Sequence, residues 1–413
     1  MSTPTLRQPP ARFVAGSAVA LAAVLFASIL TIWMTERWSV SLLKAGVLGL
    51  AAVWSGLMVI RPYRVQGSFA LVSLAGAVSI GLVQLLAGHT VDRWETWNAV
   101  LLWTVYLAAF FLGLQICSSP RLAISFRRAL LYFAFGLSIL SVLQFFTSPG
   151  KVYWLFDSGY QDAVLGPFVS RDHYAAFVEL VFPIALFEAL PDRRRTLLNT
   201  AIAGTMFASV IAGASRAGAV LLVLEAFAVL LLAMFHGLGV RKLRPAFLSL
   251  LLFTLVFGSV VGWTKLWQRF QDPDPYKYRR EMLQSSIAMA REKPWTGLGL
   301  GSFEDVYRAY ALFDEGSTVN HAHNDWAEWA AEGGVPFVAL LLLLAMWSVP
   351  QAARSIWGLG VVSVFLHSLV DFNLQLPALA AWTFVLLGAV CAEANSRTRS
   401  KQHREKPAFI RLG

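Results

Sequence analysis

The residues best suited to chemistry lie around position 323, in the stretch Asn320-His321-Ala322-His323-Asn324-Asp325. Glu328 and Glu332 follow within the next two helical turns, just before a long hydrophobic run. Burying such polar groups without hydrogen-bond partners would cost roughly 2 to 7 kcal/mol each. We therefore treat this stretch as the candidate functional site.

A neutral histidine in this stretch could act as a base, because its pKa lies near neutral pH. If a helix begins around His323, an acid one or two turns later could orient a histidine. A structural alternative is a polar helix at the membrane surface, with Trp326 and Trp329 at the level of the lipid headgroups. That alternative explains the tryptophans but not the histidines.

The spacing His321-x-His323-x-Asp325 also allows zinc chelation, and it is similar to the opening of the metallo-β-lactamase signature. That signature requires another histidine where this chain has Trp326. The stretch is not an HExxH zinc helix either. We predict no metal and no cofactor.

Arginines provide the second set of candidate residues. Arg216 lies between two hydrophobic runs, Arg171 closes the segment before another run, and Arg279 and Arg280 begin an amphipathic stretch. Guanidinium groups bind phosphate oxygens bidentately and stay charged, so such a cluster suits pyrophosphate. Snorkelling to a lipid headgroup is the alternative for Arg216, and solvated surface charge is the alternative for Arg280.

The composition is that of a membrane protein, because 57% of the 413 residues are hydrophobic and only 14% are charged. The two cysteines, Cys117 and Cys391, lie inside apolar runs and do not suggest disulfides or a zinc site. The net charge of +10 is expected to act at the membrane surface, so no nucleic-acid partner is predicted.

The hydrophobic runs predict an all-α integral membrane protein with about twelve transmembrane helices and one long helical periplasmic loop. The predicted helices are 13–34, 41–60, 68–88, 97–117, 129–147, 173–190, 196–214, 217–236, 247–264, 335–349, 356–372 and 377–394. Residues 1–264 would hold nine of them, 265–334 the loop with the candidate site, 335–396 the last three, and 397–413 a basic tail.

Arginine and lysine mark the side of the membrane on which each short loop lies. The basic clusters at Arg121, Arg127 and Arg128, at residues 193–195 and in the tail all fall on one side of the predicted topology. We therefore expect both termini to be cytoplasmic and the candidate site to lie on the opposite side of the membrane.

The long loop is expected to contain structure of its own, because loops of this length seldom lack it. Residues 278–290 are typical of an amphipathic helix, which Pro294 would end. Glycines 297, 299 and 301 favour close backbone packing rather than contact with a ligand. After the eleventh run, Asp371 is expected to pair with one of the arginines.

Four stretches of the chain, within about residues 160–377, resemble the O-antigen ligase and polymerase superfamily of integral membrane glycosyltransferases. They are Gly166–Ala175, Ser215–Gly218, Arg279 with Pro294 and Gly297-Leu298-Gly299, and His323-Asn324 with Glu332-Gly333-Gly334. In the first stretch Asp172 stands where the family often has asparagine.

The resemblance implies transfer of a glycan from undecaprenyl-pyrophosphate to a hydroxyl of a lipid or glycan acceptor, on the periplasmic face of a bacterial inner membrane, with inversion and without a metal. It implies that His323 is the base, with Asn324 and His321 in support. Arg216 and Arg279 or Arg280 would bind the leaving pyrophosphate. The choice between ligase and polymerase stays open. The alternative from another class is a multi-spanning transporter or flippase of lipid-linked or anionic substrates.

Overall fold

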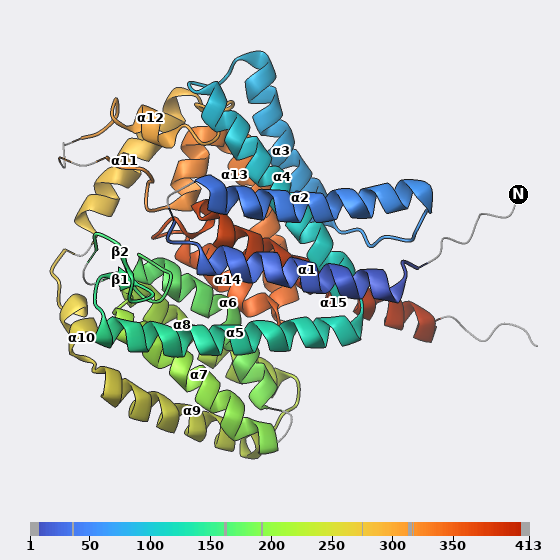
Figure 1. Ribbon diagram of the computed structural model, residues 1–413, viewed down its shortest axis with the longest axis vertical. Helices are drawn as coiled ribbons and strands as arrows, with labels where there is room; N and C mark the ends of the chain where they lie inside the picture. The colour runs from blue at the N-terminus through green and yellow to red at the C-terminus, as the bar shows by residue number, and fades with distance from the viewer. Residues whose placement is uncertain are drawn as a thin grey trace, which may run out of the picture.

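The computed structural model describes residues 8–34, 37–160, 163–190, 193–274, 276–312, 316 and 318–405. Within these ranges the chain is almost entirely helical, and long helices pack side by side in a bundle (Figure 1). Large apolar side chains such as Val59, Leu86 and Phe235 stay exposed on its surface. An apolar outer surface of this kind suits contact with lipid, which confirms the predicted all-α membrane class.

Ten helices in the described part of the chain are long and apolar enough to cross a membrane. They are α1 (Ala11–Leu30), α2 (Arg37–Ile60), α3 (Phe69–Ala87), α4 (Arg93–Cys117), α5 (Pro120–Thr147), α7 (Arg193–Gly213), α8 (Arg216–Phe235), α9 (Val240–Val261), α13 (Asp325–Ala352) and α15 (Pro377–Glu405). Two further helices, α6 (Arg171–Ala189) and α14 (Gly358–His367), coincide with the other predicted spans.

The helix α14 is shorter than the predicted span 356–372. Its ten residues extend about 15 Å, half of the hydrocarbon thickness of a bilayer. The chain turns after His367 and a short 3₁₀ turn, η1 (Asn373–Gln375), leads into α15. The polar residues of this turn therefore enter the candidate site instead of extending the helix.

The interior of the bundle is built around α15, which packs along α4 and is buried over most of its apolar length. Glycines allow this close approach, since a methyl group on Gly113 would lie 2.4 Å from the carbonyl oxygen of Val385. The predicted basic tail is helical as far as Glu405, and residues 406–413 lie outside the described part.

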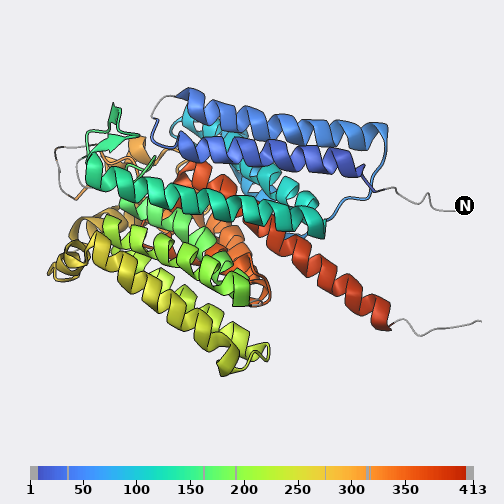
Figure 2. The same cartoon turned by 60° about the horizontal axis from the view of Figure 1, so that its bottom comes forward.

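The two ends of the bundle differ in structure (Figure 2). One end carries a hairpin of β1 (Lys151–Val152) and β2 (Phe156–Asp157), together with the short helices that follow α9. The start of α1 and the end of α15 lie at the other end. The predicted loop has the expected internal helices, α10 (Thr264–Phe270), α11 (Lys277–Glu292) and α12 (Phe303–Tyr307).

The helix α13 begins at Asp325 rather than at residue 335, and it is broken at Gly334, where φ is 68° and ψ is −174°. Its first nine residues thus belong to the candidate site, and the membrane span follows the break. The predicted glycine packing is present here, because a methyl group on Gly297 would lie 2.0 Å from the carbonyl oxygen of Glu332.

Candidate functional site

The stretch 320–324 leads directly into α13, and its backbone is fixed at the helix N-terminus. The side chain of Asn324 accepts a hydrogen bond from the amide of Ala327 at 3.0 Å, which caps the helix. Its amide nitrogen also donates to the carbonyl oxygen of Leu369 at 2.7 Å. Just before this cap, His323 has a left-handed backbone with φ of 48°, a conformation that an ordinary residue adopts only where its surroundings hold it.

His323 forms a pair with Asp371, which comes from the turn after α14. The two are joined at 2.9 Å between Nδ1 of the histidine and Oδ1 of the carboxylate. Asp371 is almost fully buried, whereas about a third of the His323 side chain is exposed. An ionised Asp371 accepts a hydrogen bond from the protonated Nδ1, which leaves Nε2 of the ring unprotonated and able to accept a proton.

The charge on Asp371 is held by its surroundings. Burial alone would raise the pKa of this carboxyl group, but the hydrogen bond with His323 and the nearby His173 and Arg279 lower it well below its ordinary value. Asp371 is therefore ionised at neutral pH and can orient the histidine ring. The predicted pairing of Asp371 with an arginine is also present, at 3.5 Å from Arg279.

Arg279, from the first turn of α11, joins this pair to the N-terminal end of α6. Its Nη2 lies 3.0 Å from Oδ2 of Asp172, and its Nη1 donates to the carbonyl oxygen of Val370 at 2.6 Å. The other oxygen of Asp172 accepts a hydrogen bond from the hydroxyl of Ser215 at 2.6 Å. A single guanidinium thus links segments that are far apart in the sequence.

Arg216 lies beside Ser215, at the N-terminus of α8. Its Nη1 donates to the carbonyl oxygen of Arg269 at 2.8 Å, and Asp272 is 3.9 Å away. The guanidinium groups of Arg216 and Arg279 stand over the same ring, that of Tyr276, at 5.2 and 5.8 Å from its centroid. Arg216 and Arg279, both selected from the sequence, therefore contact the same aromatic side chain.

The predicted residue Arg171 lies at the start of α6 and lines a cavity of about 430 Å³ next to this group. Lys265 and Arg269 of α10 line the same cavity, with Asp272 as its acidic side chain. Burial and the charge of Arg171 lower the pKa of Arg269 to about 10, because cations are concentrated here. Such a concentration of positive charge suits a polyanion.

Sequence reasoning missed Lys265 and Arg269. The signal available was their spacing of four residues, which places both on one face of a helix. Without the structure, that face could equally have been solvated, since nothing in the sequence brings α10 beside Arg171.

The structure separates Arg280 from this group. Its side chain is 63% exposed and pairs with Asp274 at 2.7 Å. Of the two adjacent arginines, Arg279 is therefore the one that faces the pair of His323 and Asp371. Consecutive residues of a helix point in different directions, so Arg280 points away from the site.

His321 belongs to a second histidine pair. Its Nδ1 lies 2.8 Å from Oε1 of Glu328, and the ring stacks on Phe372 at 4.5 Å. The same Phe372 ring also contacts His323 at 4.7 Å, so it stands between the two histidines. Burial alone would lower the pKa of His321, but the charge and hydrogen bond of Glu328 raise it. His321 lines a different cavity, of about 230 Å³, together with Glu95 and Glu304.

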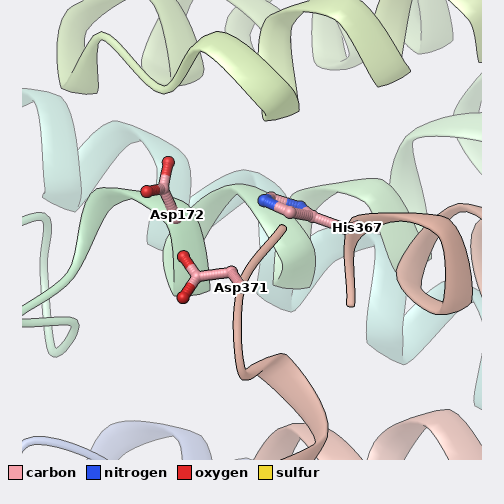
Figure 3. Close-up of side chains that lie close together, drawn as sticks. All are labelled: Asp172, His367 and Asp371. Carbon is pink, nitrogen blue, oxygen red and sulfur yellow. The ribbon is translucent and has the colours of Figure 1, made fainter. Parts of the chain in front are cut away.

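Three side chains near the site have the types and distances of metal ligands: Asp172, His367 and Asp371 (Figure 3). Their ligand atoms lie within 4.8 Å of one another. Both carboxylates already pair with Arg279, and Nδ1 of His367 lies 2.8 Å from Glu179. A metal ion would have to share these oxygens with a guanidinium, so the arrangement fits an arginine site better than a cation site.

Comparison with known proteins adds an independent observation. The family model described as O-Antigen ligase matches residues 201–342, about a third of the 413 residues. The matched part contains Arg216, Arg279 and His323. No curated protein matches the chain. Over this part the chain is therefore similar to O-antigen ligases, and the all-helical membrane fold agrees with that similarity.

Proposed function

We propose that the protein transfers a glycan from undecaprenyl-pyrophosphate to a hydroxyl group of a lipid or glycan acceptor, on the periplasmic face of the bacterial inner membrane. The observation that carries this proposal is the chain of contacts His323, Asp371, Arg279 and Asp172, which joins a base to a phosphate-binding cation. Both the ligase and the polymerase reactions have this chemistry, and they differ only in the acceptor.

In the proposed reaction, His323 is the general base. Asp371 holds Nδ1, so Nε2 accepts the proton of the acceptor hydroxyl as its oxygen attacks the anomeric carbon of the sugar. The bond from that carbon to the pyrophosphate oxygen breaks, and its electron pair leaves with the pyrophosphate. A direct displacement inverts the configuration at the anomeric carbon. A positioned base accelerates such a step by about 10² to 10⁴.

The arginines stabilise the charge that develops on the leaving group. Arg216 and Arg279 stand together over Tyr276, and Arg171, Lys265 and Arg269 extend the positive charge into the adjoining cavity. Fixed cations lower the barrier because they need no rearrangement as charge moves onto the phosphate. We expect these groups to make a divalent metal unnecessary.

The proposal is tested by glycan analysis of a deletion strain that carries either the wild-type gene or His323→Ala. We expect the variant to lose the long-chain glycan while lipid-linked intermediates remain. Retained single repeat units would indicate a polymerase, whereas retained lipid-linked polymer would indicate a ligase. The matched control is Arg280→Gln at the exposed neighbour of the site, which should restore the glycan. Normal glycans with His323→Ala would refute the base.

A further inference from the structure

A second concentration of arginines lies far from the candidate site. A cavity of about 310 Å³ is bounded by the start of α5, the end of α6 and the start of α7. Arg171 and Glu188 lie near the two ends of α6, and a separation of 17 positions along the helix corresponds to about 25 Å. We propose that this cavity binds the phosphate headgroup of an anionic phospholipid.

The cavity carries excess positive charge. Arg127, Arg128 and Arg195 line it, and Glu188 is its acidic side chain. Glu188 is divided between two of the arginines, because it pairs closely with Arg127 and lies 4.0 Å from Arg195. Among the described residues, one carboxylate thus faces three guanidinium groups, which leaves about two positive charges for a phosphate to neutralise.

Hydrogen-bonding capacity in the cavity is also unused. The Nε of Arg127 is buried and has no acceptor among the described residues. Its guanidinium is held over the ring of Trp357, at 5.8 Å from the centroid, so it is fixed in place. Within the same described ranges no acid pairs with Arg128. Buried donors are normally satisfied, and a phosphate oxygen would satisfy the Nε of Arg127, while the exposed Arg128 adds beside it a charge that no described acid pairs.

The surroundings of the cavity favour a lipid over a free phosphate. Tyr132 lies one turn after Arg128 on α5, and Leu198 lies three residues after Arg195 on α7. Both line the cavity and are about half exposed, at 54% and 51%. Each helix therefore presents a cation followed by an apolar side chain toward the middle of the bundle. This spatial order, a cation and then an apolar side chain toward the bilayer centre, matches the order of a charged lipid headgroup and its acyl chains.

The position of the cavity along the helices agrees with this assignment. Arg127, Arg128 and Arg195 belong to the basic segments that the charge distribution assigns to the cytoplasmic side. Anionic lipids are attracted to basic pockets between helices on that side of a membrane. The proposal does not depend on the glycosyltransferase activity, because the two sites lie at opposite ends of α6.

The test is native mass spectrometry of the full-length protein, released from nanodiscs that contain equal amounts of phosphatidylglycerol and phosphatidylcholine. The variant is Arg128→Gln combined with Arg195→Gln, two exposed residues whose replacement leaves the Arg127–Glu188 pair intact. The matched control is Arg121→Gln combined with Arg354→Gln, which removes the same charge from exposed positions outside the cavity.

We expect wild-type protein and the control to retain phosphatidylglycerol, and the variant to retain it about tenfold less. Equal retention by all three proteins would overturn the proposal, as would equal retention of the two lipids by the wild type. In a separate arm, inorganic phosphate is added to the delipidated protein. Phosphate that binds alone and prevents phosphatidylglycerol from binding would assign the cavity to a free anion and so overturn the lipid assignment.

Discussion

Individual residues of the candidate site depend on buried partners, and Asp371 is the most connected of them. Its two oxygens contact His323 and Arg279, so it fixes both the ring of the proposed base and the proposed phosphate ligand. We predict that Asp371→Asn lowers the rate of glycan transfer by about 10² or more, because the amide no longer selects the productive tautomer of His323. The measurement is single-turnover transfer in purified membranes.

The control for this prediction is Asp274→Asn, which removes a carboxylate paired with the exposed Arg280. It should change the rate less than twofold. An Asp371→Asn protein that transfers glycan at the wild-type rate would show that His323 does not need this partner.

The two adjacent arginines provide a matched pair. Arg279→Lys keeps the charge but loses the fork that reaches both Asp172 and the carbonyl oxygen of Val370. We expect about a tenfold or greater loss of transfer for Arg279→Lys and almost none for Arg280→Lys. Equal losses would mean that the charge of the segment, rather than the position of Arg279, matters. Thermal midpoints of both proteins would show that each variant is folded.

His321 gives a prediction about stability and pH. Its pKa is raised above the ordinary value by Glu328, so the folded protein favours the protonated ring more than the unfolded chain does. The stabilisation is complete below about pH 6.5 and is lost as the pH rises through the raised pKa. The difference in thermal midpoint between wild type and His321→Gln should therefore shrink from pH 6 to pH 9. A constant difference would contradict the ion pair.

At the scale of residues, the sequence was sufficient to select the candidate residues but not to predict which residues they contact. Histidine, arginine and aspartate in an apolar chain are conspicuous, which is why His323, Arg216 and Asp371 could be selected. Their partners are determined by packing between helices that are distant in the sequence, and no local sequence pattern predicts that packing. The same limit hid Lys265 and Arg269, whose importance comes only from lying opposite Arg171.

At the scale of elements, the break in α13 and the glycine turn before it hold the candidate site together. Val335 donates to the carbonyl oxygen of Pro294 at 2.7 Å, and the amides of Leu298 and Gly299 donate to carbonyl oxygens of α13. The side chain of Gln84, from α3, joins the same region through the carbonyl oxygens of Thr296 and Glu332. The loop is therefore tied to two membrane helices.

We predict that Gly297→Ala is strongly destabilising. The residue has φ of 66°, which costs an ordinary residue about 1 to 3 kcal/mol, and its new methyl group would meet the backbone of Glu332 at 2.0 Å. The measurement is the thermal midpoint and the amount of folded protein in detergent. Gly136→Ala in α5 is the control, because no atom lies within 4 Å of its new methyl group. Similar midpoints for the two variants would contradict the packing.

Elements were predictable where apolar length alone defines them. The spans from α1 to α9 follow from hydrophobic runs, although α5 and α9 begin nine and seven residues before the predicted starts, at Pro120 and Val240. The amphipathic pattern gave α11. The boundaries failed where polar residues enter a helix, as at Asp325 in α13, and where an apolar run ends in a turn, as after His367. In both places the tertiary contacts of the site replace the local pattern.

At the scale of the whole molecule, the basic residues predict its orientation. We expect a cysteine at Thr318, in the exposed part of the long loop, to react with a membrane-impermeant maleimide in intact spheroplasts. A cysteine at Arg121 should react only after the membrane is opened. Both are introduced after Cys117 and Cys391, which are buried, have been replaced by alanine. Labelling with the opposite pattern would remove the periplasmic glycosyltransferase proposal.

The contacts of Arg279 with Asp172 and Asp371 have a consequence for the order of biosynthesis. The three residues lie on segments that leave the ribosome at very different times, and Asp371 precedes only the last helix, α15. Until Asp371 arrives, Arg279 lacks one of its two carboxylates and His323 lacks its partner. The proposed active arrangement therefore forms only when insertion is nearly complete, so we expect a chain stalled earlier in translation to lack the proposed transfer activity.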